Sequence, residues 1–267
     1  MGHHGRMHAQ PGVRARPDTP VAEQAEQAAP NRRLPASTFR SRHSALSELQ
    51  RDTWERLWPE LGVSVVAGPS GPCGPCAEPL DTEAWFGRRA PLVLEIGCGN
   101  GASTVAMAQD EPDIDVIAVE IYRRGLAQLL SAIEREQVGN IRLIRGNGID
   151  VLEQLIAPGS LTGVRVFFPD PWPKARHHKR RFLQPATVDL IADRLLPGGV
   201  LHAATDHPGY AEHIAAVGDE ADPRLVRVEP GTESLPISVV RPTTKYETKA
   251  QEAGSDVTEL IWKRRQT

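Results

Sequence analysis

Residues 91–101 read PLVLEIGCGNG, and this stretch decides the fold. Its first six residues are nearly all apolar, as in a strand that is buried on both faces of a parallel sheet. The glycines Gly97, Gly99 and Gly101 follow at once, and glycine permits positive φ and a close approach of a ligand to the backbone. Because a helical pattern begins at Ser103, we expect a strand, a ligand-binding loop and a helix in that order.

The rest of the chain repeats this alternation of short apolar runs and helical patterns. Six further runs predict strands, and they read DVIAVE, IRLIRG, VRVFFP, PGGVLHAATD, RLVRVE and DVTELIWK. Strands that alternate with helices and are almost continuously apolar indicate a parallel sheet that is covered on both faces. We therefore predict an α/β fold with a mostly parallel, seven-stranded sheet and helices on both faces. The last two runs would form a hairpin-like pair at one edge.

Composition and charge exclude several classes of protein. The 267 residues are 40% hydrophobic and 24% charged, as in an ordinary globular protein. No apolar run is long enough to span a membrane, and the N-terminal stretch lacks the apolar core of a secretory signal, so we expect a cytoplasmic protein with no membrane partner. The formal net charge is −3, so nucleic-acid binding would have to rest on a local basic patch.

Local composition divides the chain into a tail and one domain. Residues 1–33 are rich in Pro, Gln, Ala and Arg and have almost no large apolar residues, so we predict a disordered tail. Residues 34–267 form a single predicted domain. Within it, residues 44–58 have the apolar spacing of an amphipathic helix, which Pro59 is expected to end. Residues 62–80 are rich in Gly and Pro and predict a flexible loop.

The cysteines indicate neither a disulfide framework nor a metal site. The chain has three, Cys73, Cys76 and Cys98, and an odd, low number argues against a disulfide framework. Cys73 and Cys76 form a C-x-x-C pair, but a zinc site usually needs four ligands and no second pair follows. We therefore expect two free thiols in a loop, and no bound metal.

An acid beside the glycine loop indicates which ligand the loop binds. The pattern is E-x-G-x-G-x-G, with Glu95 two residues before Gly97, whereas the dinucleotide fingerprint is G-x-G-x-x-G. A carboxylate repels a pyrophosphate and attracts a sulfonium or ammonium group, so S-adenosylmethionine is favoured over NAD as the cofactor. Glu120 ends the second strand, where it would accept both ribose hydroxyls of an adenosine or be a solvated strand end. Asn147 would contact adenine or only form a turn.

Residues 167–181, FFPDPWPKARHHKRR, join a strand end to a dense cationic run. Asp170 lies where the fourth strand of the helix-flanked series ends, and a substrate would meet the cofactor there. Trp172 either packs against a base or the cofactor, or is structural. The run contains no acid, so it either forms a solvated face or neutralises phosphates of a nucleic acid. Its members are Lys174, Arg176, His177, His178, Lys179, Arg180 and Arg181.

Five motifs together resemble one family. They are LEIGCGNG, AVEIY, FFPDPWPKARHHKRR, TDHPGYAEH and TKYETKA. From about residue 39 to about residue 263, the chain is similar to the bacterial tRNA (guanine-N(7)-)-methyltransferases, which are class I S-adenosylmethionine-dependent enzymes. The string PDPW-x-K-x-R-H-x-K-R-R is the most specific part of the resemblance. It implies a Rossmann-like methyltransferase fold, S-adenosylmethionine as cofactor, and a guanine of the tRNA variable loop as the methylated base.

The resemblance also implies roles for residues, position by position. Asp170 is similar to the catalytic acid of the family, and residues 176–181 resemble its RNA-contacting segment. Cofactor contacts are implied at Glu95, Glu120, Asn147 and Asp170. Substrate contacts are implied at Lys174, Asp206, Thr244, Lys245, Tyr246 and Glu247. The chain departs from the family pattern at Asn147, where the family often has Asp, and in the GPCGPC segment.

The implied chemistry does not require a strong base. N7 of neutral guanine has a free lone pair, so methyl transfer needs no prior loss of a proton, and Asp170 is expected to act by alignment and electrostatics. Three other functions compete: methylation of an exocyclic amine, NAD-dependent oxidation and RNA binding without catalysis. The expected partner is tRNA, and the chain is expected to be a monomer or a homodimer.

Overall fold

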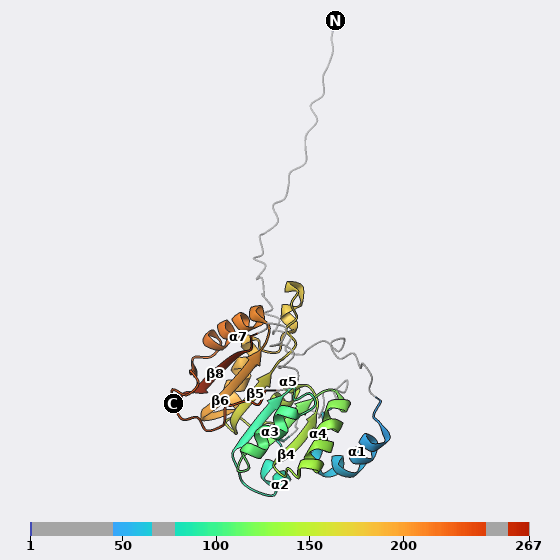
Figure 1. Ribbon diagram of the computed structural model, residues 1–267. Helices are drawn as coiled ribbons and strands as arrows, with labels where there is room; N and C mark the ends of the chain where they lie inside the picture. Colours follow the sequence, from blue (N-terminus) through green and yellow to red (C-terminus); the bar gives the residue numbers. More distant parts are fainter. Residues whose placement is uncertain (2–44, 66–77, 244–255, 267) are drawn as a thin grey trace. The chain divides into compact units, whose positions relative to one another are not determined.

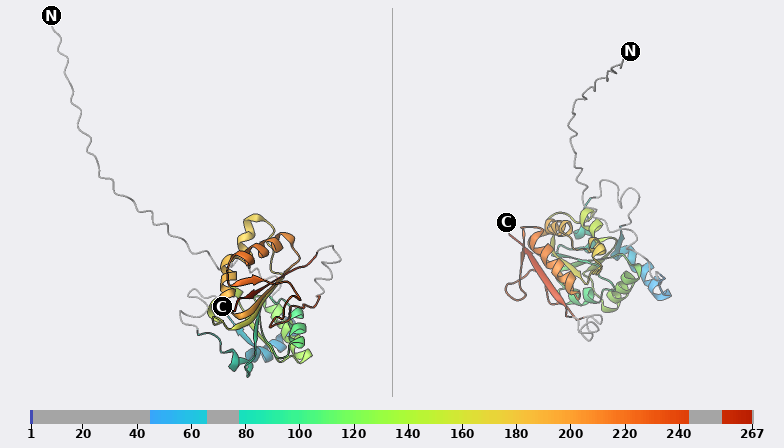
Figure 2. Two further views of the ribbon diagram at one scale, coloured as in Figure 1. Left: turned by 90° about the vertical axis from the view of Figure 1, so that its left-hand side faces the viewer. Right: turned by 90° about the horizontal axis from the view of Figure 1, so that it is seen from above.

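The fold is an eight-stranded sheet with helices on both faces (Figure 1, Figure 2). The computed structural model describes Met1 and residues 45–65, 78–243 and 256–266. Contacts divide the chain into Met1–Asn31 and Arg32–Thr267, and the helices and strands of the described residues belong to the second unit. The strands are β1 (Gly62–Ser64), β2 (Leu92–Ile96), β3 (Asp115–Glu120), β4 (Ile141–Arg145), β5 (Leu161–Phe167), β6 (Leu195–Thr205), β7 (Leu225–Arg227) and β8 (Thr258–Arg264).

Eight helices accompany these strands within the described ranges. They are α1 (Glu48–Leu61), α2 (Thr82–Phe86), α3 (Ala102–Asp110), α4 (Arg123–Glu136), α5 (Gly148–Gln154), the 3-10 helix η2 (Ala175–Arg180), α6 (Pro185–Arg194) and α7 (Pro208–Glu220). None of the helices in the described part of the chain is long and apolar enough to cross a membrane.

The topology of the sheet confirms the predicted α/β fold. The strand order is β1-β4-β3-β2-β5-β6-β8-β7. Neighbours among β1 to β6 pair in parallel, whereas β8 pairs antiparallel with both β6 and β7. The last two strands pair with each other at one edge, as expected, and β8 lies between β6 and β7.

The sequence predicts seven strands, and the structure has one more. The additional strand, β1, lies at the start of residues 62–80, for which the sequence predicts a loop, and it pairs in parallel with β4 through Val63 and Ile144. Three residues are too few to show an alternating pattern, so only the tertiary contact reveals this strand. Residues 66–77, with Cys73 and Cys76, lie outside the described residues, as does the predicted tail apart from Met1.

Helix α1 begins with a capping box and continues past a proline. The Ser47 hydroxyl accepts the N–H of Gln50, and the Gln50 side chain accepts the N–H of Ser47, which satisfies two donors at the helix start. The sequence predicts an end at Pro59, but the helix runs to Leu61. A proline in the last turn removes only one helical hydrogen bond, and Trp58 and Leu61 pack against the core beside α4, which favours the longer helix.

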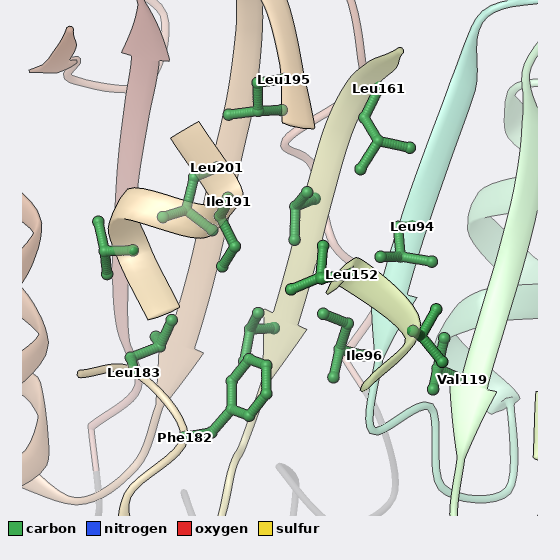
Figure 3. Close-up of a cluster of buried hydrophobic side chains, with 14 of the residues drawn as sticks. Leu94, Ile96, Val119, Leu152, Leu161, Phe182, Leu183, Ile191, Leu195 and Leu201 are labelled. Atoms are coloured by element: carbon green, nitrogen blue, oxygen red, sulfur yellow. The ribbon is translucent and has the colours of Figure 1, made fainter. Parts of the chain in front are cut away.

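Two apolar layers, one on each face of the sheet, hold the helices in place. On one face, strand side chains such as Leu94 and Leu201 pack with Leu152 of α5 and Ile191 of α6 (Figure 3). On the other face, the strands pack with α1, α3 and α4. Ile96 belongs to the first layer and also lines a cavity at the carboxyl ends of the strands, so the core fixes one wall of that cavity.

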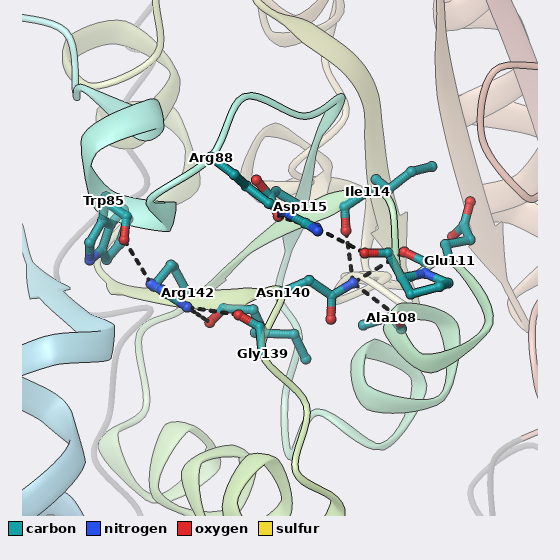
Figure 4. Close-up of polar contacts among 11 residues, drawn as sticks. Trp85, Arg88, Ala108, Glu111, Ile114, Asp115, Gly139, Asn140 and Arg142 are labelled. Carbon is teal, nitrogen blue, oxygen red and sulfur yellow. Dashed lines mark hydrogen bonds and ion pairs between the residues drawn. The ribbon is translucent and has the colours of Figure 1, made fainter.

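Asn140 fixes the connection between α3 and β3 (Figure 4). Its Nδ2 lies 3.0 Å from the carbonyl oxygen of Ala108, 3.1 Å from that of Glu111 and 2.8 Å from that of Ile114. Two N–H bonds therefore serve three acceptors. The carbonyl oxygen of Glu111 also accepts the N–H of Ile114. Because Asn140 is buried, its side chain mainly satisfies the carbonyl groups of Ala108 and Ile114 at the helix end and the turn.

Replacing Asn140 should destabilise the fold. We expect Asn140→Ala to lower the free energy of unfolding by about 2 kcal/mol, because buried carbonyl groups lose their donor. Equilibrium urea denaturation measures the change. Gln109→Ala is the matched control, since Gln109 is exposed near the end of α3, and we expect a change below about 0.5 kcal/mol. Equal effects of the two substitutions would contradict this role of Asn140.

Candidate active site

A cavity lies at the carboxyl ends of β2, β3, β4 and β5, next to the glycine loop. It encloses about 210 Å³. Ligands of open α/β sheets bind at this edge, so the position agrees with the site that the sequence predicts. The lining residues are 96, 97, 119–122, 146–148, 166–170, 172, 180 and 182.

The three glycines of the loop adopt the left-handed conformation that the sequence predicts. Their φ angles are 79° at Gly97, 58° at Gly99 and 75° at Gly101. Gly97 lines the cavity. At Gly101, a Cβ would lie 2.4 Å from Cδ1 of Leu129, so this glycine is needed for packing against α4. The structure thus brings Gly97 to the cavity, while Gly99 and Gly101 shape the loop behind it.

A fourth glycine, outside the loop motif, lets the loop lie against α4. Gly125 is in the first turn of this helix, and a Cβ there would lie 2.2 Å from the carbonyl oxygen of Gly99. No other residue fits such a close approach. Its signal in the sequence is a single glycine inside the helical pattern RRGLAQLL, because glycine weakens a helix by about 1 kcal/mol relative to alanine and is kept there for a packing reason.

The Glu120 carboxylate accepts three backbone N–H groups. Oε1 accepts from Ile121 at 2.7 Å and from Tyr122 at 3.0 Å, and Oε2 accepts from Gly99 at 3.0 Å. Burial raises the pKa of Glu120, and the three amides act in the opposite direction. The side chain is 7% exposed and is therefore not a solvated strand end. Since a carboxylate has about four lone-pair positions, about one remains for a ligand hydroxyl, rather than the two positions that the sequence suggests.

Glu95 lies near the carboxyl end of β2 and is 3% exposed. Among the described residues, its Oε2 has no hydrogen-bond partner. Arg165 of β5 is its neighbour in the sheet register. Burial raises the pKa of Glu95, and the positive charge of Arg165 opposes this rise. The hydroxyl of Thr104, a buried neighbour on α3, acts in the same direction as Arg165 by hydrogen-bonding to the Glu95 carboxylate. Glu95 is not among the residues that line the cavity.

Asn147 lines the cavity and caps α5. Its Oδ1 accepts the backbone N–H of Ile149 at 3.0 Å, an N-cap interaction that stabilises the start of the helix. The structure therefore confirms the local role that the sequence leaves open. Because Oδ1 has two lone pairs and accepts one hydrogen bond here, the side-chain N–H groups and one lone pair of Asn147 are left to contact a base.

Asp170 lies on the exposed rim of the cavity, between two residues in an unfavourable backbone conformation. The φ angle is 50° at Phe168 and 43° at Trp172. Such angles cost about 1–3 kcal/mol for residues other than glycine, and they persist where the surroundings fix them. The negative charge of Asp170 is one cause of the raised pKa of Glu120, so the two carboxylates interact across the cavity that both line.

Trp172 has a structural role in this loop. The guanidinium carbon of Arg180 lies 5.1 Å from the centre of its ring, and His177 meets the same ring edge-on, with 5.8 Å between ring centres. Desolvation and the positive charges of neighbouring Lys and Arg side chains lower the pKa of His177. Arg180 and Trp172 both line the cavity, and together they form one of its walls.

The cationic run does not present one uniform face. Lys174, Arg176 and Lys179 are exposed, and His178 is half-buried. Arg181 differs from the others, because only 3% of it is exposed. The structure therefore separates Arg181 from the segment that the sequence predicts to contact RNA.

The remaining predicted residues lie farther along the chain. Asp206 directly follows β6 and is half-buried, and it is not among the residues that line the cavity. Thr244, Lys245, Tyr246 and Glu247 lie outside the described residues. Within residues 45–65, 78–243 and 256–266, no three His, Cys, Asp or Glu side chains gather as a metal ion would require.

Comparison with known proteins identifies the family. A family model described as "Putative methyltransferase" matches residues 89–260. A tRNA (guanine-N(7)-)-methyltransferase of Mycolicibacterium paratuberculosis is 68% identical over 267 residues, which cover 99% of this chain and 100% of that protein. This chain belongs to the tRNA (guanine-N(7)-)-methyltransferase family. A relative of the same name from Mycobacterium ulcerans is 65% identical over 277 residues, with 99% of each chain covered.

The tRNA (guanine-N(7)-)-methyltransferase family is the one that the sequence motifs resemble, and membership confirms that interpretation. The matched residues 89–260 include the whole lining of the cavity, whereas α1 and β1 precede them. The solved structure of the aminoglycoside resistance methyltransferase NpmB1 is a more distant match. It has 15% identity and a TM-score of 0.45 over 69% of this chain and 92% of that chain.

A side chain at Gly125 should disturb the glycine loop. We expect Gly125→Ala to lower the free energy of unfolding by about 1–3 kcal/mol, because the added methyl group overpacks the contact with Gly99. Gly139→Ala is the control, since a Cβ there meets no atom within 4 Å, and we expect no loss of stability. Urea denaturation measures both, and a Gly125→Ala protein as stable as the control would show that the contact can relax.

Proposed function

We propose that this protein transfers a methyl group from S-adenosylmethionine to N7 of a guanine in the variable loop of tRNA. One observation carries the proposal: the glycine-loop cavity, the Asp170 carboxylate and the cations of η2 meet at one edge of the sheet. Membership in the tRNA (guanine-N(7)-)-methyltransferase family supports the same reaction and substrate.

The residues around the cavity fit S-adenosylmethionine. Glu95 is a buried acid on the strand that leads into Gly97 of the cavity lining, and its negative charge would attract the cationic methionine end of that molecule. Glu120 keeps about one lone-pair position for a ribose hydroxyl. Asn147 lines the same cavity, where its side-chain N–H groups would donate to an adenine nitrogen. When bound, the cofactor supplies an electrophilic methyl group.

The exposed cations of the run are proposed to hold tRNA. Lys174, Arg176 and Lys179 are exposed close to Asp170 in the chain, and Lys and Arg side chains neutralise phosphates regardless of base sequence. Such contacts position the RNA and do not select the base. For base selection, the family resemblance proposes Asp206, together with Thr244, Lys245, Tyr246 and Glu247.

Asp170 is proposed to assist the transfer without removing a proton from the base. N7 is an acceptor on the free edge of guanine, so its lone pair is available for attack. Positive charge develops on the purine as N7 gains the methyl group. The Asp170 carboxylate would offset this charge or accept a hydrogen bond from a guanine N–H group. Its fixed position in a constrained loop means that little reorganisation is needed during the reaction.

Two alternative functions have weaker support. A methyltransferase for exocyclic amines often carries Pro-Pro-aromatic after its acid or amide, whereas Pro-Trp-Pro follows Asp170 here. An NAD-dependent oxidoreductase would place a pyrophosphate near Glu95, whose negative charge would repel it. The cytoplasmic location and the monomeric or homodimeric state stay predictions.

The purified protein is expected to methylate unmodified tRNA. Incubation with radiolabelled S-adenosylmethionine, followed by digestion and nucleoside analysis, should yield 7-methylguanosine that maps to the variable loop. Label on an exocyclic amine would favour the first alternative. S-Adenosylhomocysteine should raise the melting temperature and NAD should not, because only the former lacks a pyrophosphate; stabilisation by NAD alone would favour the oxidoreductase.

Removal of the Asp170 carboxylate should affect the rate more than binding. We expect Asp170→Ala to lower the single-turnover rate by on the order of 100-fold, the usual effect of losing one electrostatic contact in the transition state. The affinity for tRNA should change much less. Asp113→Ala, at an exposed position near the amino end of β3, is the control and should retain the wild-type rate. A large loss of affinity with an unchanged rate would refute this role for Asp170.

A further inference from the structure

Arg181 ends the cationic run without contributing to its surface. It is 3% exposed, whereas Arg176 and Lys179 are exposed. Burying a guanidinium group is unfavourable unless its N–H groups are hydrogen-bonded. Arg181 finds these partners inside the protein, so a role other than RNA contact must explain its position.

Four groups surround the Arg181 guanidinium. Nε donates to the carbonyl oxygen of Pro171 at 2.9 Å, and Nη1 donates to the carbonyl oxygen of Gly209 at 3.4 Å. Nη2 lies 3.1 Å from Nε2 of His178, and Nε2 must accept because a guanidinium has no acceptor. The guanidinium carbon also lies 4.8 Å from the centre of the Tyr210 ring, which is a cation–π contact.

These contacts join three segments of the candidate site. Pro171 directly follows Asp170 in the loop after β5. Gly209 lies in the first turn of α7, three residues after Asp206. The third partner belongs to η2. One buried guanidinium therefore links the loop that carries Asp170, the turn that carries Asp206 and the helix that carries the exposed cations.

The backbone of the loop around Asp170 adopts unfavourable conformations that contacts with the rest of the protein must stabilise. The positive φ angles of Phe168 and Trp172, 50° and 43°, are unfavourable and persist only where other contacts fix them. Helix η2 is also unusual, because it is six residues long and 3-10 helices rarely exceed about four. The hydrogen bonds from Arg181 to the carbonyl oxygen of Pro171 and to η2 supply such a constraint.

The three-residue period of η2 explains why adjacent cations point in different directions. In a 3-10 helix, side chains three positions apart lie on the same side. One side of η2 is exposed, the next packs on Trp172, and the third is turned inward. In that order they hold Arg176 with Lys179, His177 with Arg180, and His178. Arg181, which directly follows η2, is turned inward next to His178.

We propose that Arg181 is a positioning residue for the methyl-transfer reaction. It holds the segments of Asp170 and Asp206 at a fixed separation, and so determines where the guanine lies relative to the transferred methyl group. This inference rests on the proposed function. It assigns the tRNA phosphate contacts of the run to its exposed members and excludes Arg181 from them.

The substitution Arg181→Lys distinguishes a positioning role from a phosphate contact with tRNA. Lysine keeps the positive charge that a phosphate contact needs, but it lacks the planar fork that bonds three groups at once. For Arg181→Lys and Arg181→Met, we expect the single-turnover rate at saturating tRNA to fall by on the order of 10- to 100-fold, because the reacting groups are misplaced. The slope of log Kd for tRNA against log salt concentration should stay at the wild-type value in both.

Arg176→Met is the matched control from an exposed position in the same run. It removes a proposed phosphate contact, so we expect weaker tRNA binding and a salt slope smaller in magnitude by about 1. The proposal is overturned if Arg181→Met shows this same change of slope while Arg181→Lys keeps the wild-type rate. Arg181 would then be a phosphate contact.

His178→Ala tests the same proposal in case the Arg181 variants do not fold. His178 is half-buried, and its loss removes only one acceptor of the guanidinium, so the rate should fall by a smaller factor with no change of slope. A wild-type rate in His178→Ala would overturn the proposal even where Arg181 variants fail to fold. Thermal melts with S-adenosylhomocysteine test folding. Absence of methylation by the wild-type protein would refute the proposed function and this inference together, whereas an active wild type with an unimpaired Arg181→Lys refutes the inference alone.

Discussion

The three backbone N–H groups that converge on the Glu120 carboxylate are the constraint on which the site depends. Glu120 ends β3, and Gly99 lies in the loop after β2, so their hydrogen bond ties two neighbouring strands together at their carboxyl ends. Gly125 then allows α4 to pack directly behind the loop. The carboxylate of Glu120 and the helix α4 therefore both hold the loop in place.

A second constraint comes from charge that is buried inside the sheet. Arg165 is fully buried, and its Nη2 donates to Glu111 and, at 3.1 Å, to the carbonyl oxygen of Ser238. Glu111 in turn accepts the N–H of Ser238 at 2.6 Å. Breaking a buried ion pair of this kind costs about 3–5 kcal/mol. The strand that precedes Asp170 is thereby tied to the segment around Ser238.

The sequence predicts those parts of the site that depend on strand ends. Gly97, Glu120 and Asp170 each follow an apolar run, and a parallel sheet brings such positions to one edge without further information. Strand β1 has no pattern of its own, because three residues show no period. Gly125 contacts Gly99, and Arg181 contacts Gly209 and Tyr210. These partners are more than 20 residues away in the chain, so neither composition nor motif spacing predicts the contacts. Tertiary contacts therefore decide what local patterns leave open.

The number of Lys and Arg residues in the cationic run overstates the positive charge that the run exposes at the surface. Five Lys and Arg residues lie between positions 174 and 181, but Arg180 packs on Trp172 and Arg181 is buried, so three cations are exposed. The protein has a net charge of −3, so attraction for tRNA would depend on the small patch of exposed cations. The three-residue period of η2 determines which way these side chains point. Arg181 directly follows η2 and donates to the carbonyl oxygen of Pro171, beside Asp170. One short segment therefore sets both the direction of the exposed cations and the position of the Asp170 loop.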